Sequence, residues 1–289
     1  MSPREIRLMK WEGRAGSDNI EDRRGMGGRQ LAVGGGLGGL ILLLLVSALT
    51  GRNPADLIDT GEPPTDGGQY QAADPNDPQY KFVSVVLKDT EDTWGELFAQ
   101  AGRTYERPAL VLFNDATQSA CGVGQSEMGP FYCPADRKVY LDLSFFRELD
   151  ERFAAPGDFA RAYVVAHEVG HHIQMLTGIS QRLQTARERS GEREGNALSV
   201  RQELQADCYA GVFGYYEAKR GVLDPGDAEE GLRAAAAIGD DTLQRQTQGR
   251  IVPESFTHGS SAQRVAWFKR GLESGRVDAC NTFTDGGVP

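Results

Sequence analysis

The stretch Ala166-His167-Glu168-Val169-Gly170-His171-His172 holds three of the four histidines in a chain of 289 residues. Residues four positions apart lie on one face of a helix, so His167 and His171 would present their imidazoles side by side, at a separation that one zinc ion can span. Glu168 projects from the adjacent face, where it can take a proton from a metal-activated water without being a ligand. The spacing predicts a zinc-binding helix with Glu168 as its catalytic base.

An amphipathic helix with solvated histidines is the alternative. The preceding segment 159–166 is apolar except for Arg161, which indicates a helix buried on most of its surface. Buried histidines need partners, and a metal supplies them. His172 points about 100° away from His171 on a helix, so we expect it to support the site without binding the ion, or to lie at the surface.

A third ligand is needed, because catalytic zinc sites have three protein ligands and one open position. No histidine follows at short spacing, so the best candidate is Glu203 in a predicted helix at 199–220. Asp207 lies one turn further on and can accept the N–H of a zinc-bound histidine. A solvated acidic pair is the alternative, but the neighbouring Leu204 and Ala206 argue against exposure.

His258, the fourth histidine, precedes a predicted helix that contains Arg264. It is a candidate catalytic donor to the oxyanion of peptide hydrolysis, with Arg264 as a positional support. An ordinary exposed loop histidine remains the alternative. The predicted strand at 139–143 could pair with an extended substrate if it lies at a sheet edge, and an inner position is equally compatible.

Two separated motifs resemble a known class of enzymes. The pattern from His167 to His171, followed by Glu203-Leu204-Gln205-Ala206-Asp207, resembles the gluzincins, which carry HExxH and then ExxxD. More closely, the segments 16–24, 129–134 and 139–144 are similar to the bacterial neutral zinc metallopeptidase family. The resemblance covers nearly the whole chain outside the linker, and implies a zincin fold, one membrane anchor and peptidase chemistry. It implies no particular substrate.

Composition narrows the choice of partners. The chain is 39% hydrophobic and 25% charged, which is ordinary for a folded domain, and its formal net charge is −10. Nucleic acid is not expected as a partner, because phosphate binding requires clustered basic residues. The same charge argues against attachment of the folded part to anionic lipid.

The segment 31–50 carries no charge and is long enough for a helix to cross a hydrocarbon core of about 30 Å. Basic residues are frequent before it, whereas none occurs between Arg52 and Lys81, which predicts a cytoplasmic N-terminus. A cleaved signal peptide would have an unusually long leading region, and a buried core helix fits the charged flanks poorly. We therefore expect a single-pass cell-membrane protein with its catalytic domain outside the cytoplasm. Five glycines between positions 34 and 39 predict a weak homodimer through this helix.

Four regions follow from these patterns: a cytoplasmic tail at 1–30, a transmembrane helix at 31–50, a Pro/Gly/Asp-rich linker at 51–78 and a zinc metallopeptidase domain at 79–289. An oxidising compartment favours disulfides, and three pairings of the four cysteines are open. Our first choice is Cys121 with Cys133 and Cys208 with Cys280.

The domain is predicted to be α+β and zincin-like, mainly helical with a small sheet, and preceded by the transmembrane helix. We expect strands at 109–113 and 138–143 (the second half-exposed) and helices that start at 90, span 158–177 and 199–220, span 228–248 with a break near Gly239, and run from 260 or 261 to 271.

The predicted function is zinc-dependent hydrolysis of peptide bonds in a protein or peptide substrate, with His167, His171 and Glu203 as ligands of Zn²⁺. A zinc hydrolase of another amide bond, such as one in the cell wall, and a zinc-stabilised binding module without turnover are the alternatives. Glu168 favours the enzymes, because a structural zinc site is closed by four protein ligands and needs no base.

Overall fold

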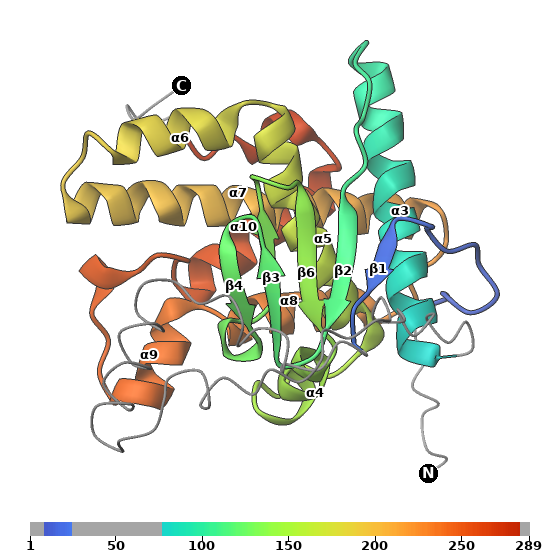
Figure 1. The fold of residues 1–289 in the computed structure, drawn as a ribbon, viewed down its shortest axis with the longest axis horizontal. Helices are drawn as coiled ribbons and strands as arrows, with labels where there is room; N and C mark the ends of the chain where they lie inside the picture. Colours follow the sequence, from blue (N-terminus) through green and yellow to red (C-terminus); the bar gives the residue numbers. More distant parts are fainter. Residues whose placement is uncertain (1–8, 25–76, 284–289) are drawn as a thin grey trace, which may run out of the picture.

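The computed structural model describes residues 9–24 and 77–283, and their elements are shown in Figure 1. The strands are β1 (Ile20–Asp22), β2 (Ala109–Phe113), β3 (Ala116–Ser119), β4 (Gly122–Gln125), β5 (Phe131–Cys133) and β6 (Lys138–Asp142). The helices are α3 (Pro78–Gln100), η2 (Ser126–Met128), α4 (Ser144–Glu151), α5 (Asp158–Leu176), α6 (Ile179–Arg187), α7 (Glu192–Lys219), α8 (Asp227–Ala237), α9 (Asp240–Gln248), η3 (Pro253–Ser255), α10 (Ser261–Ser274) and η4 (Val277–Cys280). The described domain is mostly helical with two small sheets, in agreement with the predicted α+β class.

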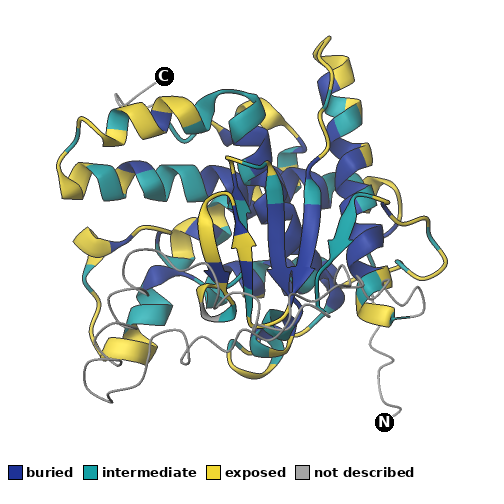
Figure 2. Ribbon diagram, viewed as in Figure 1, coloured by how far each residue is buried: buried dark blue, intermediate teal, exposed yellow. Residues whose placement is uncertain are grey.

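The larger sheet has the strand order β1-β2-β6-β5. The pairs β1–β2 and β2–β6 are parallel, whereas β5 runs antiparallel to β6. Both predicted strands are present, but β6 is an inner strand and is mostly buried, as Figure 2 shows. The expectation of a half-exposed strand at 138–143 was therefore wrong, and the edge near the histidine helix is β5.

Both faces of this sheet are covered, which explains why β6 is buried. Leu110 and Val139 lie on the face that packs into the main core, together with residues of α3 and α5. Val111 and Tyr140 lie on the opposite face, in a smaller apolar cluster that includes Cys133. Because successive side chains of a strand point to opposite faces, one short strand contributes to both clusters.

Helix α5 lies at the centre of the domain and packs against α3, α7 and α8. Its predicted span is confirmed, and Gly178 follows it in a left-handed conformation with φ of 74°. The predicted break at Gly239 is also confirmed, since this residue caps α9. Helix α10 begins at Ser261, as predicted, after a capping box formed by Ser260 and Gln263, and ends three residues beyond the predicted stop.

Two predicted helix starts were wrong. Thr90 lies inside α3, where its hydroxyl donates to the backbone carbonyl of Leu87 at 2.7 Å. Ser199 lies inside α7 and its hydroxyl donates to the carbonyl of Gly195 at 3.1 Å. Both hydroxyls are satisfied within their own helices, so a residue type that favours caps did not mark a boundary.

The N-terminal segment 9–24 is part of the domain. Strand β1 pairs with β2, and the indole of Trp11 donates to Asp158 at 2.9 Å. Arg14 makes two hydrogen bonds of 2.6 Å to the carboxylate of Asp89. The prediction of a separate cytoplasmic tail at 1–30 was therefore wrong for these residues. One membrane crossing between residues 24 and 77 would place two packed parts on opposite sides of a bilayer, so the predicted single-pass topology is corrected as well.

Among the helices formed by residues 9–24 and 77–283, none combines the length and the apolar character that a bilayer crossing requires. The longest, α3 and α7, carry charged side chains along their length. The transmembrane helix in the predicted fold class and the cell-membrane location that depended on it are corrected accordingly. The segments 31–50 and 51–76, with the glycines on which the homodimer prediction rested, lie outside the described residues.

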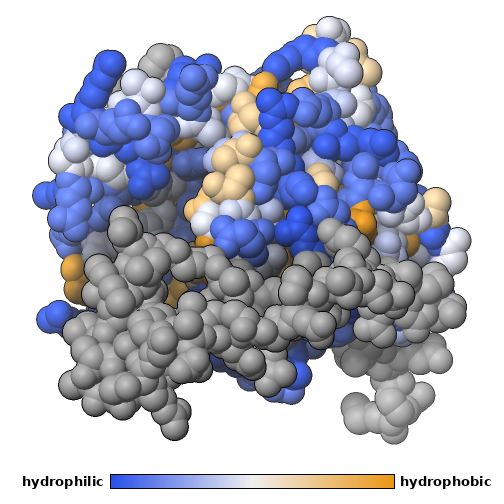
Figure 3. Space-filling model, in the orientation of Figure 1, coloured by the Kyte–Doolittle hydropathy of each residue, from blue (hydrophilic) through white to orange (hydrophobic). Residues whose placement is uncertain are grey.

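Both predicted disulfides are present. Cys121 to Cys133 ties the β3–β4 hairpin to β5, and Cys208 to Cys280 ties α7 to η4 near the end of the described chain. On the face of the molecule in Figure 3, the visible described surface is predominantly hydrophilic, as expected for a chain of net charge −10.

Candidate metal centre

Gly170 permits the close packing of helices that builds the site. A Cβ at this position would lie 3.1 Å from the Cα of Ala206, closer than most real side-chain contacts. Helices α5 and α7 therefore approach each other at the turn that carries His167 and His171 on one side and Glu203 on the other. The small residue inside the HExxH pattern thus brings a distant carboxylate to the histidines.

The three predicted ligands come together. One candidate donor atom from each of His167, His171 and Glu203 lies within 4.8 Å of the other two. Nε2 of His167 is 3.1 Å from one oxygen of Glu203, and Nε2 of His171 is 3.5 Å from the other. Two imidazoles and one carboxylate, with space left for a fourth ligand, form the donor set of many catalytic zinc sites. Within residues 9–24 and 77–283, no other such group of His, Cys, Asp or Glu is found.

Asp207 fixes the orientation of His167. Its Oδ1 accepts from Nδ1 of His167 at 2.9 Å, so Nε2 is the ring nitrogen that faces Glu203 and can bind a metal ion. Tyr163 donates to the same oxygen at 2.5 Å, and Nε of Arg264 donates to Oδ2 at 2.9 Å. Burial alone would raise the pKa of Asp207, but the charge of Arg264 and the hydrogen bond from His167 lower it to about 2.

The electrostatics of the cluster favour a cation. Burial would lower the pKa of His167, yet hydrogen bonds and charges from Asp207 and Glu203 raise it to about 10. Burial would raise the pKa of Glu203, but both histidines hold it well below its usual value. Asp207 is paired with Arg264, so the carboxylates of Glu203 and Glu168 remain beside the two imidazoles. A divalent cation fits this excess of negative charge.

Glu168 is positioned as a free acceptor. The residue is 7% exposed, and its carboxylate makes no hydrogen bond or ion pair with the described part of the chain. It lines a groove of about 1090 Å³ together with His167, His171 and Glu203. Other walls of the groove come from β5, α4, α6 and α9, through residues that include Phe131, Tyr132, Phe145, Gln184 and Leu243.

His258 also lines the groove, held there by Asp240. One oxygen of Asp240 accepts from the backbone N–H groups of Thr257, His258 and Gly259 at 2.8, 2.6 and 2.9 Å. The other oxygen accepts from Nδ1 of His258 at 3.2 Å. This hydrogen bond raises the pKa of His258, although burial acts in the opposite direction. Arg264 binds Asp207 instead of His258, so its predicted role as a support of His258 was wrong.

His172 is fully buried and faces away from the three donors. Its Nε2 donates to the carbonyl of Glu106 at 2.7 Å, so Nδ1 accepts from the hydroxyl of Tyr132 at 2.9 Å. The predicted alternative of a surface position was wrong. His172 connects the histidine helix to the edge strand β5, which carries Tyr132.

Three residues of the site were not identified from the sequence: Tyr163, Gln174 and Asp240. Tyr163 precedes His167 by four residues, and Gln174 follows His171 by three, so both share the histidine face of α5. This spacing could have identified both residues from the sequence. Asp240 acts through a loop 17 to 19 residues further along, and no local pattern indicates this.

The family described as "Putative neutral zinc metallopeptidase" matches residues 9–283. The chain belongs to this family. The resemblance proposed from its motifs is thus confirmed. The match begins at residue 9, so this neutral zinc metallopeptidase family includes the N-terminal segment that carries β1.

Two relatives of the chain are similar to it over most of their length. "Uncharacterized protein YpfJ" of Escherichia coli is 51% identical over 284 residues, which cover 95% of this chain and 99% of that protein. "Uncharacterized protein Rv2575" of Mycobacterium tuberculosis is 40% identical over 245 residues, covering 81% and 80%. No solved structure matches the chain significantly.

Proposed function

We propose that this protein is a zinc-dependent peptidase, with His167, His171 and Glu203 as the ligands of the ion. The observation that carries the proposal is the convergence of these three donors beside Glu168, whose carboxylate has no other partner in the described chain. A bound zinc ion at this position lowers the pKa of water and polarises a carbonyl group.

Glu168 is the general base in this account. It accepts a proton from the attacking water and returns it to the nitrogen of the leaving amine. Asp207 keeps Nδ1 of His167 protonated, so that Nε2 presents a lone pair to the ion. His258 stabilises the oxyanion of the tetrahedral intermediate, because Asp240 occupies Nδ1 and directs the rest of the ring to the groove.

The groove suits an extended peptide. Strand β5 lies at the edge of the sheet, and its residues Phe131 and Tyr132 line the groove beside the histidines. An edge strand can pair with the backbone of an extended chain, which provides affinity that is independent of side chains. Strand β6, the candidate from the sequence, is an inner strand and cannot serve in this way.

The substitution Glu168→Gln tests the proposal. We expect the variant to bind zinc as the wild-type protein does and to lose at least about 100-fold in hydrolysis of a peptide library, because general bases contribute about 10²–10⁴-fold. Glu148→Gln is the matched control, since Glu148 lines the same groove but pairs with Arg152. Full activity of the Glu168 variant would refute the assignment.

Two other outcomes distinguish the alternative functions. Chelator-sensitive cleavage of a non-peptide amide, with no cleavage of the peptide library, would identify a hydrolase of another bond. Binding of stoichiometric zinc without any turnover would identify a binding module. The unpaired carboxylate of Glu168 favours the peptidase over the binding module, because a structural site needs no base.

A further inference from the structure

His171, unlike His167, has no carboxylate at its Nδ1 position. Its Nδ1 lies 2.9 Å from Oε1 of Gln174, one turn further along α5. Gln174 is fully buried between α5 and α7. An amide is a weaker orienting group than a carboxylate, and it can present either its oxygen or its nitrogen. The orientation of Gln174 therefore determines which tautomer of His171 is stable.

Backbone carbonyl groups fix that orientation. The amide nitrogen of Gln174 donates to the carbonyl of Gln202 at 2.7 Å and to Oε1 of Gln205 at 3.1 Å. Gln205 in turn donates from its own nitrogen to the carbonyl of Cys280 at 3.0 Å. A carbonyl can only accept, so neither amide can be turned over without the loss of a buried hydrogen bond.

All hydrogen bonds in this chain are donated in one direction, from the metal centre towards the carbonyl of Cys280. Since the nitrogen of Gln174 is committed to Gln202 and Gln205, only its oxygen faces His171. Nδ1 of His171 must then carry the hydrogen, so Nε2, 3.5 Å from Glu203, is the nitrogen left to bind a metal ion. This is the tautomer that a metal ligand requires.

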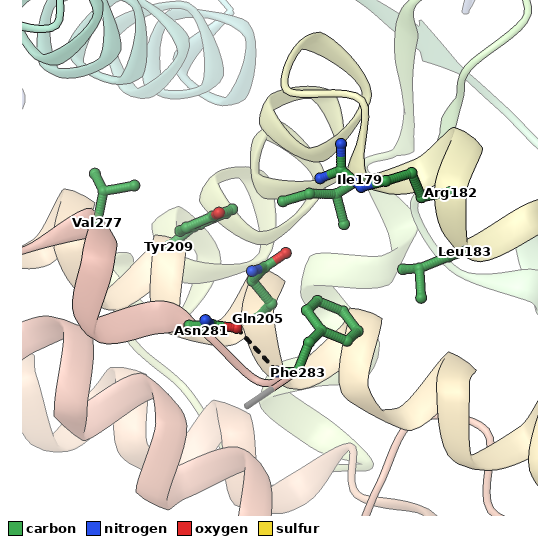
Figure 4. A pocket seen from close by; sticks show the side chains of 8 residues that line it. All are labelled: Ile179, Arg182, Leu183, Gln205, Tyr209, Val277, Asn281 and Phe283. Carbon is green, nitrogen blue, oxygen red and sulfur yellow. Dashed lines mark hydrogen bonds between the residues drawn. The ribbon is translucent and has the colours of Figure 1, made fainter. Parts of the chain in front are cut away.

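The chain ends at a segment fastened by a disulfide. Figure 4 shows Gln205 between Tyr209 and Asn281, where α7 faces the C-terminal part of the described chain around a cavity of about 280 Å³. The bond from Cys280 to Cys208 holds the accepting carbonyl against α7, three residues beyond Gln205. The side chains of Gln205 and Gln174 thus connect the C-terminal segment to His171.

We propose that Gln174 and Gln205 are positioning residues that set the tautomer of His171 for metal binding, with the Cys280 carbonyl as the fixed end of the relay. The proposal rests on the proposed function only in that His171 is a zinc ligand. Loss of a hydrogen-bond partner of a ligating histidine lowers metal affinity by about 10–100-fold.

Zinc affinity, measured by competition with a chromophoric chelator, tests the relay. We expect Gln174→Met to weaken zinc binding by about 10–100-fold, and Gln205→Met to weaken it less. Added to Gln174→Met, the Gln205 substitution should cause no further loss, because Gln205 acts only through Gln174. Gln100→Met is the control, since Gln100 bonds only Glu96 on the exposed surface of α3.

The variant Gln174→Glu separates positioning from a structural role. It keeps an acceptor for His171 but cannot donate to Gln202 or Gln205, so it should be as unstable to urea without zinc as Gln174→Met while retaining near wild-type zinc affinity. Equal loss of affinity in both variants, or wild-type affinity in Gln174→Met, would overturn the relay. Absence of zinc from the wild-type protein would overturn the proposed function, and the relay with it.

Discussion

Arg264 and Asp207 form a fully buried ion pair behind the metal centre, with Nε 2.9 Å from Oδ2 and Nη2 2.9 Å from Oδ1. Asp207 also accepts from His167, so the pair connects α10 to the histidine helix. Removal of one partner leaves a buried charge without compensation, which typically costs about 3–5 kcal/mol. The orientation of a metal ligand and the packing of the domain therefore depend on the same carboxylate.

We predict that Arg264→Met lowers the free energy of unfolding by about 3–5 kcal/mol, as measured by urea denaturation of the zinc-free protein. The double variant with Asp207→Asn should be more stable than the single variant, because no charge is then left unpaired. Arg276→Met, which removes an exposed pair with Asp278, is the control and should change stability little. If the double variant were less stable than Arg264→Met alone, the ion pair would not be the cause.

His258→Ala should lower kcat by about 10²–10³-fold and leave zinc affinity unchanged, since His258 is not among the three donors. Steady-state kinetics on a cleaved peptide and chelator competition measure the two effects. A variant that lost zinc as well as activity would show that His258 belongs to the metal site rather than to the reaction.

The charge of His258 predicts a pH dependence. Nδ1 is bonded to Asp240, so only the protonated ring has an Nε2–H to donate, and activity should fall as pH rises through the pKa of His258. The hydrogen bond to Asp240 raises this pKa, and burial lowers it; the charge of Glu203 also raises it, and that of Arg264 lowers it. Asp240→Asn should therefore move the alkaline limb of kcat to lower pH. The limb should stay in place in Asp241→Asn, because Asp241 accepts from Ser261 rather than from His258.

Asp89 predicts a separate pH effect on stability. Burial and the charge of Glu217 raise its pKa to about 7, against the charge and hydrogen bonds of Arg14. A carboxyl whose pKa is raised by folding stabilises the protein below its unfolded pKa of about 4, and this contribution is lost as pH rises through 7. Between pH 5 and 8, the wild-type protein should lose about 2 kcal/mol relative to Asp89→Asn. If the free energies of unfolding of the two proteins, measured by urea denaturation, changed in parallel between pH 5 and 8, this prediction would be contradicted.

The two disulfides should differ in their effect on stability. Cys208 and Cys280 are 72 residues apart, whereas Cys121 and Cys133 are 12 apart. In the loop-entropy account, removal of the longer link costs about 4 kcal/mol and removal of the shorter about 3 kcal/mol. Two variants, each with both cysteines of one disulfide replaced by Ala, are unfolded in urea without zinc. Their free energies of unfolding show which disulfide contributes more to stability. We further expect only the Cys208/Cys280 variant to bind zinc more weakly, because the Cys280 carbonyl holds Gln205.

The donor set could be predicted because its information is local. His167 and His171 are one helical turn apart, as are Glu203 and Asp207, so two short patterns placed four side chains on two helix faces. The contacts that orient them come from elsewhere in the chain. Arg264 reaches Asp207 from α10, and Asp240 reaches its partners across a loop, so periodicity carries no signal for either.

The errors in the fold have a similar origin. The helix predicted to start at 90 begins at Pro78 instead, because the preceding apolar run at 82–87, whose pattern alone does not mark it as helical, is part of α3. Strand β1 has only three residues, and its pairing with β2 identifies it. Trp11 and Arg14 pack on the domain, and this packing contradicts a single membrane crossing between them and the rest of the domain. The length and hydropathy of 31–50 carried no information about it.

The zinc content of the purified protein and of its Glu203→Gln variant, measured by elemental analysis, tests whether His167, His171 and Glu203 bind the ion together. We predict one zinc ion per wild-type chain and its loss from the variant on dialysis, because α5 supplies two ligands and α7 must supply the third. A wild-type protein without stoichiometric zinc, or a variant that retains zinc as firmly as the wild type, would contradict it.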